Sequence, residues 1–245
     1  MIKLLLRNAH IEGKATLVDV AITDGRIVEV GPNLAIDAKQ EIKVNGCLII
    51  PAFVESHLHL DIALMNDWQV PGRPEPFLSL NGLNQSLERR RREFTVEDIE
   101  HRASTALEVA SRHGVTAMRA QCHVDREVGL KHVEVLQAIK EKFVEKVALQ
   151  IVAFPQQGLI NHPENADLFR EAFQIGADVM GGASNLDILD EGSIDWHRHI
   201  DAAFDLAMEL DVDLDIHADL GIPKSVNYED LETVYIAQKT IERGY

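Results

Sequence analysis

The alternation of short apolar runs with longer amphipathic runs after Pro51 constrains the fold most strongly. Short apolar runs are typical of buried strands, and runs with apolar residues at helical spacing are typical of helices packed against them. Strands that alternate with helices form a parallel sheet. The pattern predicts strands near residues 48–54, 115–121, 147–154, 177–181 and 212–217. It predicts helices near residues 96–113, 129–143, 164–175, 196–210 and 229–243.

The first 50 residues follow a different pattern, in which short alternating runs are separated by turn-forming pairs. These pairs are Asp24-Gly25, Gly31-Pro32 and Asn45-Gly46, and such pairs favour tight turns between strands. We therefore expect a small β-rich module over residues 1–50, as part of a β-sandwich. Residues 51–245 are expected to form the N-terminal part of an α/β barrel of the eight-stranded TIM type, with about five βα units.

Composition excludes several classes of partner. Asp and Glu number 40 against 24 Lys and Arg, which gives a formal net charge of −16. Nucleic acids and anionic membranes need clustered cations, so we expect neither as a partner. No apolar run approaches the roughly 18 residues that span a bilayer. The two cysteines, Cys47 and Cys122, form no CxxC pair, which favours a protein of the reducing cytoplasm.

The segment with the most chemical information is Ser56-His57-Leu58-His59-Leu60-Asp61 at the end of the first predicted barrel strand. Side chains alternate along a strand, so His57 and His59 point to the same side while the leucines face the packing side. Paired imidazoles suit zinc and also iron. The alternative is a pair of histidines that hydrogen-bond to backbone carbonyls, and the position at the end of a buried strand argues against it.

A third histidine, His217, ends the last predicted strand. The carboxyl ends of barrel strands surround one opening, so residues far apart in sequence can share an ion there. We therefore expect His57, His59 and His217 to bind one divalent metal ion, zinc or iron. Such an ion activates water for attack on an sp² carbon, which makes hydrolysis the expected chemistry.

These motifs resemble the amidohydrolase superfamily and, within it, the cytosine deaminase branch. The resemblance covers nearly the whole chain. It rests on SHLHLD at 56–61, CHVD at 122–125, IVAFPQQG at 151–158, GADVMGG at 176–182 and DIHAD at 215–219. It implies a metal-dependent hydrolase of C–N bonds in cyclic nitrogen-rich substrates, which releases an amine or ammonia. The small-molecule substrate would then be a heterocycle.

The resemblance also implies roles for individual residues. It makes the three histidines the metal ligands and Gln156 the amide that binds the substrate ring. An amide offers a donor and an acceptor together, as a pyrimidine or triazine edge requires, although Gln156 could instead be a solvated loop residue. His123 is expected to line the opening and bind substrate, or else to be a buried core histidine. Asp61 could orient a ligand histidine or cap a turn.

The sequence departs from the family pattern in the residue that carries protons. The family has a glutamate three residues after the strand-five histidine, and this chain has Leu220 there. Asp219 is the candidate catalytic substitute, with hydrogen bonding to nearby backbone as the alternative. Two further family ligands, an aspartate general base among them, would lie beyond Tyr245. We therefore expect a truncated barrel, a poorly active isolated chain, and sheet edges that favour homo-oligomers.

Three alternative functions remain open on the sequence. The chain could belong to a related amidohydrolase that acts on amides or N-alkyl triazines. It could be an inactive barrel fragment that serves as a binding scaffold, or a protein whose histidines are only structural. A further expectation concerns Arg89 to Arg92, which we interpret as a solvated helix face because Glu88 and Glu93 flank them.

Overall fold

The computed structural model describes residues 2–65, 91–187, 195–220 and 227–245. The chain divides into two compact units, Met1–Ala52 and Phe53–Tyr245. The first unit is all β, and the second alternates strands with helices. Each unit is described by itself below.

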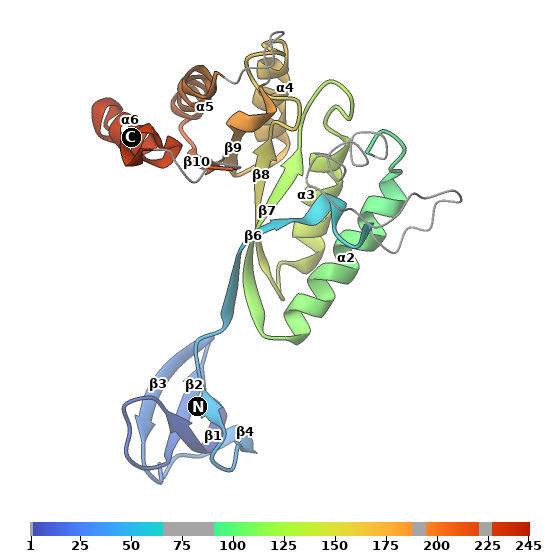
Figure 1. Ribbon diagram of the computed structural model, residues 1–245. Helices are drawn as coiled ribbons and strands as arrows, with labels where there is room; N and C mark the ends of the chain where they lie inside the picture. Colours follow the sequence, from blue (N-terminus) through green and yellow to red (C-terminus); the bar gives the residue numbers. More distant parts are fainter. Residues whose placement is uncertain (1, 66–90, 188–194, 221–226) are drawn as a thin grey trace, which may run out of the picture. The chain divides into compact units, whose positions relative to one another are not determined.

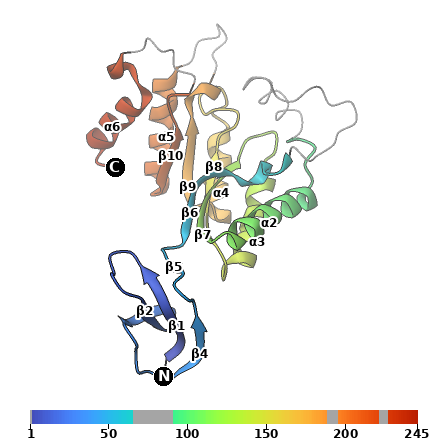
Figure 2. The same cartoon turned by 60° about the horizontal axis from the view of Figure 1, so that its bottom comes forward.

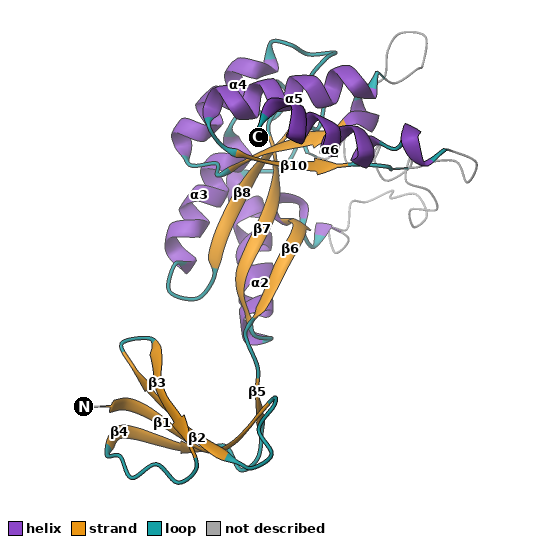
Figure 3. Cartoon of the chain, turned by 90° about the vertical axis from the view of Figure 1, so that its left-hand side faces the viewer, coloured by secondary structure: helices purple, strands orange, loops and turns teal. Residues whose placement is uncertain are grey.

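The N-terminal unit contains a twisted sheet in the strand order β3-β2-β1-β4, with β5 paired to β1 (Figure 3). Positive φ angles at Asp24 and Gly25, 50° and 72°, form the tight turn between β2 and β3, as the Asp-Gly pair predicts. Leu5 and Val20 are buried between the strands. The strands are β1 (Ile2–Ile11), β2 (Val18–Thr23), β3 (Arg26–Gly31), β4 (Ala38–Lys43) and β5 (Leu48–Ile49).

The second unit is built on an all-parallel sheet in the order β10-β9-β8-β7-β6 (Figure 1). This arrangement confirms the predicted partial barrel of five βα units. Its strands are β6 (Phe53–His59), β7 (Val115–His123), β8 (Ala148–Phe154), β9 (Val179–Ala183) and β10 (Asp213–His217). Its helices are α2 (Val96–Arg112), α3 (Lys131–Phe143), α4 (Asn165–Ile175), α5 (Trp196–Leu210) and α6 (Glu232–Arg243).

Amphipathic helices cover the sheet and form the core with it. On α2, Ile99, Ala103 and Leu107 follow one another at four-residue spacing and are fully buried, so they form one face of the helix. Helices α2 and α3 lie side by side against β7 and β8, and α5 packs on β9 and β10 beside α6 (Figures 1 and 2). Among the residues that the structure describes, no helix is both long and apolar enough to cross a membrane.

The first predicted barrel strand differs from the observed one. The sequence predicts a strand near 48–54, whereas the structure has the short β5 at Leu48–Ile49 and a separate β6 at Phe53–His59. Pro51 lies between them and has no N–H to donate to a sheet. Because β6 begins later than predicted, it extends through the His57–His59 pair, which forms the last residues of the strand.

Candidate metal centre

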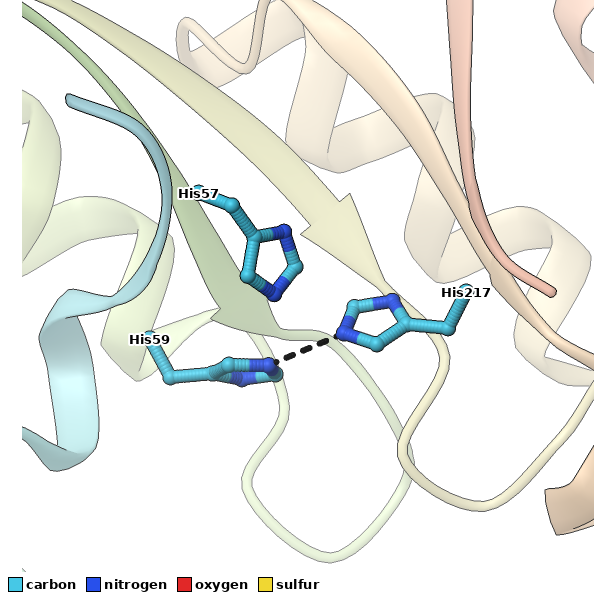
Figure 4. A group of neighbouring side chains, drawn as sticks. All are labelled: His57, His59 and His217. Carbon is cyan, nitrogen blue, oxygen red and sulfur yellow. Dashed lines mark hydrogen bonds between the residues drawn. The ribbon is translucent and has the colours of Figure 1, made fainter. Parts of the chain in front are cut away.

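The three histidines come from the two edge strands of the parallel sheet. His57 and His59 end β6, and His217 ends β10 at the opposite edge. The sheet nevertheless curves enough that His59 Nε2 lies 3.1 Å from His217 Nε2. One ring nitrogen from each histidine lies within 4.8 Å of the others, and Figure 4 shows the three rings facing one another. The structure thus brings together residues that are 158 positions apart.

Phe154 packs beside this group of histidines. It ends β8, and its ring centroid lies 5.2 Å from that of His59 and 4.9 Å from that of His217. His57 is exposed, so the group is covered on the Phe154 side and open on the other. Phe154 was not predicted as a site residue. Its place in the IVAFPQQG motif, at the end of a predicted strand, is a signal that could have identified it.

The electrostatic environment keeps two of these imidazoles neutral. Burial, together with the neighbouring His123, lowers the pKa of His59 to about 3. Burial and the adjacent His57 also lower the pKa of His217. Nδ1 of both His59 and His217 is buried and finds no hydrogen-bond partner within the described parts of the chain. Neutral imidazoles are the form that binds a metal ion, so this donor set fits zinc or iron.

We predict that the metal-free chain loses stability in mild acid. The pKa of His59 is about 3 when folded against a usual 6.5, so the unfolded chain binds more protons between these values and stability rises with pH there. From pH 5 to 6.5 one such site contributes up to about 2 kcal/mol, and stability levels off above 6.5. Thermal unfolding in EDTA across this range measures the slope. His59→Gln should reduce it, with the remainder coming from His123 and His217, whose pKa values burial also lowers. An unchanged slope in that variant would contradict the assignment.

Hydrogen bonds between polar side chains connect β7 with β10, on the N-terminal side of His217. Arg119 Nη1 donates to Asp215 Oδ2 at 3.1 Å, and Gln121 Nε2 donates to Asp215 Oδ1 at 3.4 Å. Asp215 precedes His217 by two residues, so both side chains point to the same side of β10. These hydrogen bonds therefore fix the strand that carries His217.

Asp61 belongs to a second buried group, which lies beside the first. Its Oδ2 accepts hydrogen bonds from His132 Nδ1 at 2.7 Å and from the backbone N–H of His123 at 3.0 Å. All three side chains are fully buried. Burial raises the pKa of Asp61, but the histidines outweigh this effect and hold that pKa well below its usual range. The hydrogen bonds of Asp61 thus go to His123 and His132, while its negative charge partly offsets the lowering of the His59 pKa by burial.

His123 belongs to the second group and lies beside the first. Its ring centroid is 6.1 Å from that of His59 and 5.9 Å from that of Phe154. Burial lowers its pKa, so the ring is neutral. Its Nδ1 lies 3.2 Å from Asp61 Oδ2, but neither ring nitrogen makes a well-oriented hydrogen bond among the described residues. The ring is fully buried, as the alternative of a core histidine expects, and a substrate-binding role for it stays a prediction.

Gln156 follows Phe154 by two residues on the loop after β8. Its backbone N–H donates to Phe154 O at 3.1 Å, which keeps the loop folded against the strand end. The residue is only 8% exposed, unlike a glutamine in a solvated loop. This position suits the predicted recognition of a substrate ring, which remains untested.

The carboxylate of Asp219 accepts hydrogen bonds from the first two residues of helix α6. Its Oδ1 accepts from the backbone N–H of Glu232 at 2.7 Å, and its Oδ2 accepts from Thr233 Oγ1 at 2.6 Å. Glu232 in turn accepts from the backbone N–H of Asp219 at 2.9 Å. These are the contacts of the alternative interpretation, in which Asp219 binds nearby backbone. Leu220 is exposed. A catalytic role for Asp219 stays a prediction.

Several known proteins are similar to this chain in sequence and structure. No protein-family model matches the chain. The chain is 30% identical over 255 residues to N-isopropylammelide isopropyl amidohydrolase of Pseudomonas sp. strain ADP. The matched region covers 99% of this chain and 58% of that protein.

Two solved structures resemble the chain over nearly its full length. One is 5-methylcytosine deaminase from Klebsiella pneumoniae liganded with 5-fluorocytosine, with a TM-score of 0.79, 28% identity, and coverage of 98% of this chain and 56% of that one. The other is N-isopropylammelide isopropylaminohydrolase from Burkholderia multivorans, with a TM-score of 0.79, 28% identity, and coverage of 100% and 59%. The chain spans less than two thirds of each relative. These similarities support an assignment of the chain to the amidohydrolase superfamily, as a cytosine deaminase-like member.

Proposed function

We propose that this chain supplies the metal-binding and ring-recognition parts of a hydrolase that breaks C–N bonds in cyclic, nitrogen-rich substrates. The observation that carries the proposal is the convergence of three histidine nitrogens within 4.8 Å at the carboxyl ends of β6 and β10. In parallel barrels this end of the strands is where active sites form. The names of the relatives, a deaminase and isopropylammelide hydrolases, support the substrate class.

His57, His59 and His217 would hold one divalent ion, zinc or iron. When bound there, such an ion lowers the pKa of water and polarises the carbon under attack. The chain's own residues then bind and orient the substrate. Phe154 excludes water from one side, Gln156 pairs with the donor and acceptor on the ring edge, and His123 offers a neutral imidazole.

Asp219 is the proposed acid–base group because it follows His217 by two residues. It would hold or release a proton at a carboxylate oxygen that now binds Thr233 or the N–H of Glu232. Proton transfer would therefore compete with capping of α6. Asp219→Asn separates the two roles, since asparagine also caps helices but carries no titratable proton.

A second candidate function is removal of an alkylamine from an N-substituted triazine. Leu220 stands where the resemblance expects a proton-shuttling glutamate, and the Pseudomonas relative is named for an N-isopropyl substrate. A non-catalytic scaffold is the alternative from another class.

Metal content and product identity test these proposals. We expect the purified chain to bind one zinc or iron ion, measured by elemental analysis after dialysis. Loaded protein should bind cytosine-like and triazine rings in calorimetry, and product analysis should find ammonia for a deaminase or isopropylamine for the triazine reaction. A chain that retains no stoichiometric metal and only self-associates would contradict the enzyme proposal and favour the scaffold.

We also propose a cytoplasmic location and association between copies. Both cysteines are free thiols, which suits a reducing compartment. Strands β6 and β10 are edges of the sheet, and edge strands pair readily with other chains. Light scattering of the purified chain measures the oligomeric state.

A further inference from the structure

We infer that Asp187 and His199 form a buried clamp that positions Gln156 for ring recognition. This inference rests on the proposed function, because it assigns Asp187 an indirect role in substrate binding through the loop after β8. Asp187 is therefore a positioning residue, since it acts through the loop and does not touch the ligand.

The carboxylate of Asp187 binds three successive backbone N–H groups of that loop. Leu159 N–H donates to Oδ2 at 2.8 Å, and the N–H groups of Ile160 and Asn161 donate to Oδ1 at 2.9 and 3.0 Å. Successive N–H groups that point at one anion form a concave binding site for it. Asp187 thus fixes the exit of the loop only a few residues after Gln156.

His199 on α5 holds the carboxylate from the other side. Its Nδ1 lies 2.5 Å from Asp187 Oδ2, and its Nε2 lies 2.8 Å from the backbone nitrogen of Ala183. A backbone N–H can only donate, so Nε2 accepts and Nδ1 carries the proton that it donates to Asp187. Asp187 and His199 are both fully buried. The clamp therefore ties the Gln156 loop to β9 and α5.

Gly158 is the residue that makes room for the clamp. Its φ is +78°, and a Cβ built there would lie 2.1 Å from Asp187 Oδ1. The turn between Pro155 and Gly158 is closed by a hydrogen bond of 2.9 Å from Gly158 N to Pro155 O. Gln156 lies inside this turn, so the carboxylate and the glycine together set where Gln156 stands.

The charge of Asp187 is part of the clamp. Burial raises its pKa, but the hydrogen bonds from His199 and from the three backbone N–H groups outweigh burial and lower the pKa overall. The carboxylate is therefore ionised, and it accepts charge-assisted hydrogen bonds. Asn in its place offers one acceptor oxygen and brings an NH₂ group against backbone donors, so Asp187→Asn should release the loop.

The test compares Asp187→Asn with Asp178→Asn as a matched control. Asp178 also binds the backbone of β8, since it accepts from Ile151 N–H at 2.7 Å, and it pairs with Lys140 of α3. Hydrogen exchange should accelerate by about tenfold or more at the amides of 159–161 in Asp187→Asn only. Zinc content should stay at the wild-type value in both variants.

Ligand binding gives the readout that a merely structural role would not move. We expect Asp187→Asn to weaken binding of 5-fluorocytosine or N-isopropylammelide, whichever the zinc-loaded chain binds, by about ten- to a hundredfold. In a Gln156→Ala background the same change should cost little, because the residue it positions is already gone.

Each outcome separates this inference from the proposed function. If Gln156→Ala weakens binding but Asp187→Asn does not, or if the two effects simply add, the clamp is overturned while the proposed function stands. If the wild-type chain binds neither ring, or Gln156→Ala has no effect, the proposed role of Gln156 fails and the positioning role fails with it. Faster exchange in Asp178→Asn at the same amides would also overturn the clamp.

Discussion

Replacing His217 by alanine is expected to abolish stoichiometric metal binding. His217 is the only one of the three histidines that comes from β10, and its Nε2 lies 3.1 Å from that of His59. Its loss leaves two ligands on a single strand. We expect the affinity for zinc to fall by more than the roughly 10–100-fold that removal of an outer partner of a ligand costs. Competition with a chromophoric chelator measures the change.

His101→Ala is the matched control for this prediction. His101 is an exposed histidine on α2, so its removal should leave the metal affinity unchanged and should report any nonspecific binding by surface imidazoles. Equal affinity in His217→Ala and the wild-type chain, with both folded by circular dichroism, would contradict the assignment of His217 as a ligand.

Replacing Asp61 by alanine is expected to destabilise the second unit by about 2–5 kcal/mol. The fully buried carboxylate accepts hydrogen bonds from His132 Nδ1 and from the N–H of His123. Alanine would leave both donors buried without an acceptor, and a buried unpaired donor costs far more than an exposed one. Urea unfolding at pH 7, followed by tryptophan fluorescence and circular dichroism, measures the difference.

Two further variants make this result interpretable. Glu145→Ala removes an exposed carboxylate and should change stability by no more than about 0.5 kcal/mol. Asp61→Asn keeps one acceptor oxygen and should cost less than alanine does. A loss in Asp61→Ala as small as in Glu145→Ala would show that the buried hydrogen bonds contribute little.

Much of the fold was predictable because strand and helix periods are local properties. Helix α5 spans the predicted residues 196–210, since its apolar face repeats at helical spacing between the capping Asp195 and the left-handed Asp211. The convergence of the histidines was also predictable. It requires only that the HxH pair and His217 lie at the ends of parallel strands, because the carboxyl ends of barrel strands surround one opening.

The contacts between distant polar residues were not predictable. The arginines at 89–92 were expected to form a solvated face. Arg91 is instead fully buried and pairs with Asp125, whereas Arg92 is exposed; Arg89 and Arg90 lie outside the described residues. Asp61 binds His132, which is 71 positions away. Charge patterning along a chain reports helix faces, but it carries no information about which buried partner the fold brings to a side chain.

The three histidines lie on the two edge strands of one sheet, and this placement has a mechanical consequence. Strands β6 and β10 are joined through three intervening strands, and their ends approach one another only while the sheet keeps its bend. An ion bound by residues of both edge strands would hold the sheet in this bent form. Any ligand that binds the bent form more tightly shifts the population toward it. Flattening of the sheet would then release the ion. A substitution in β7, β8 or β9 that flattens the sheet would therefore weaken metal binding without changing any of the three histidines.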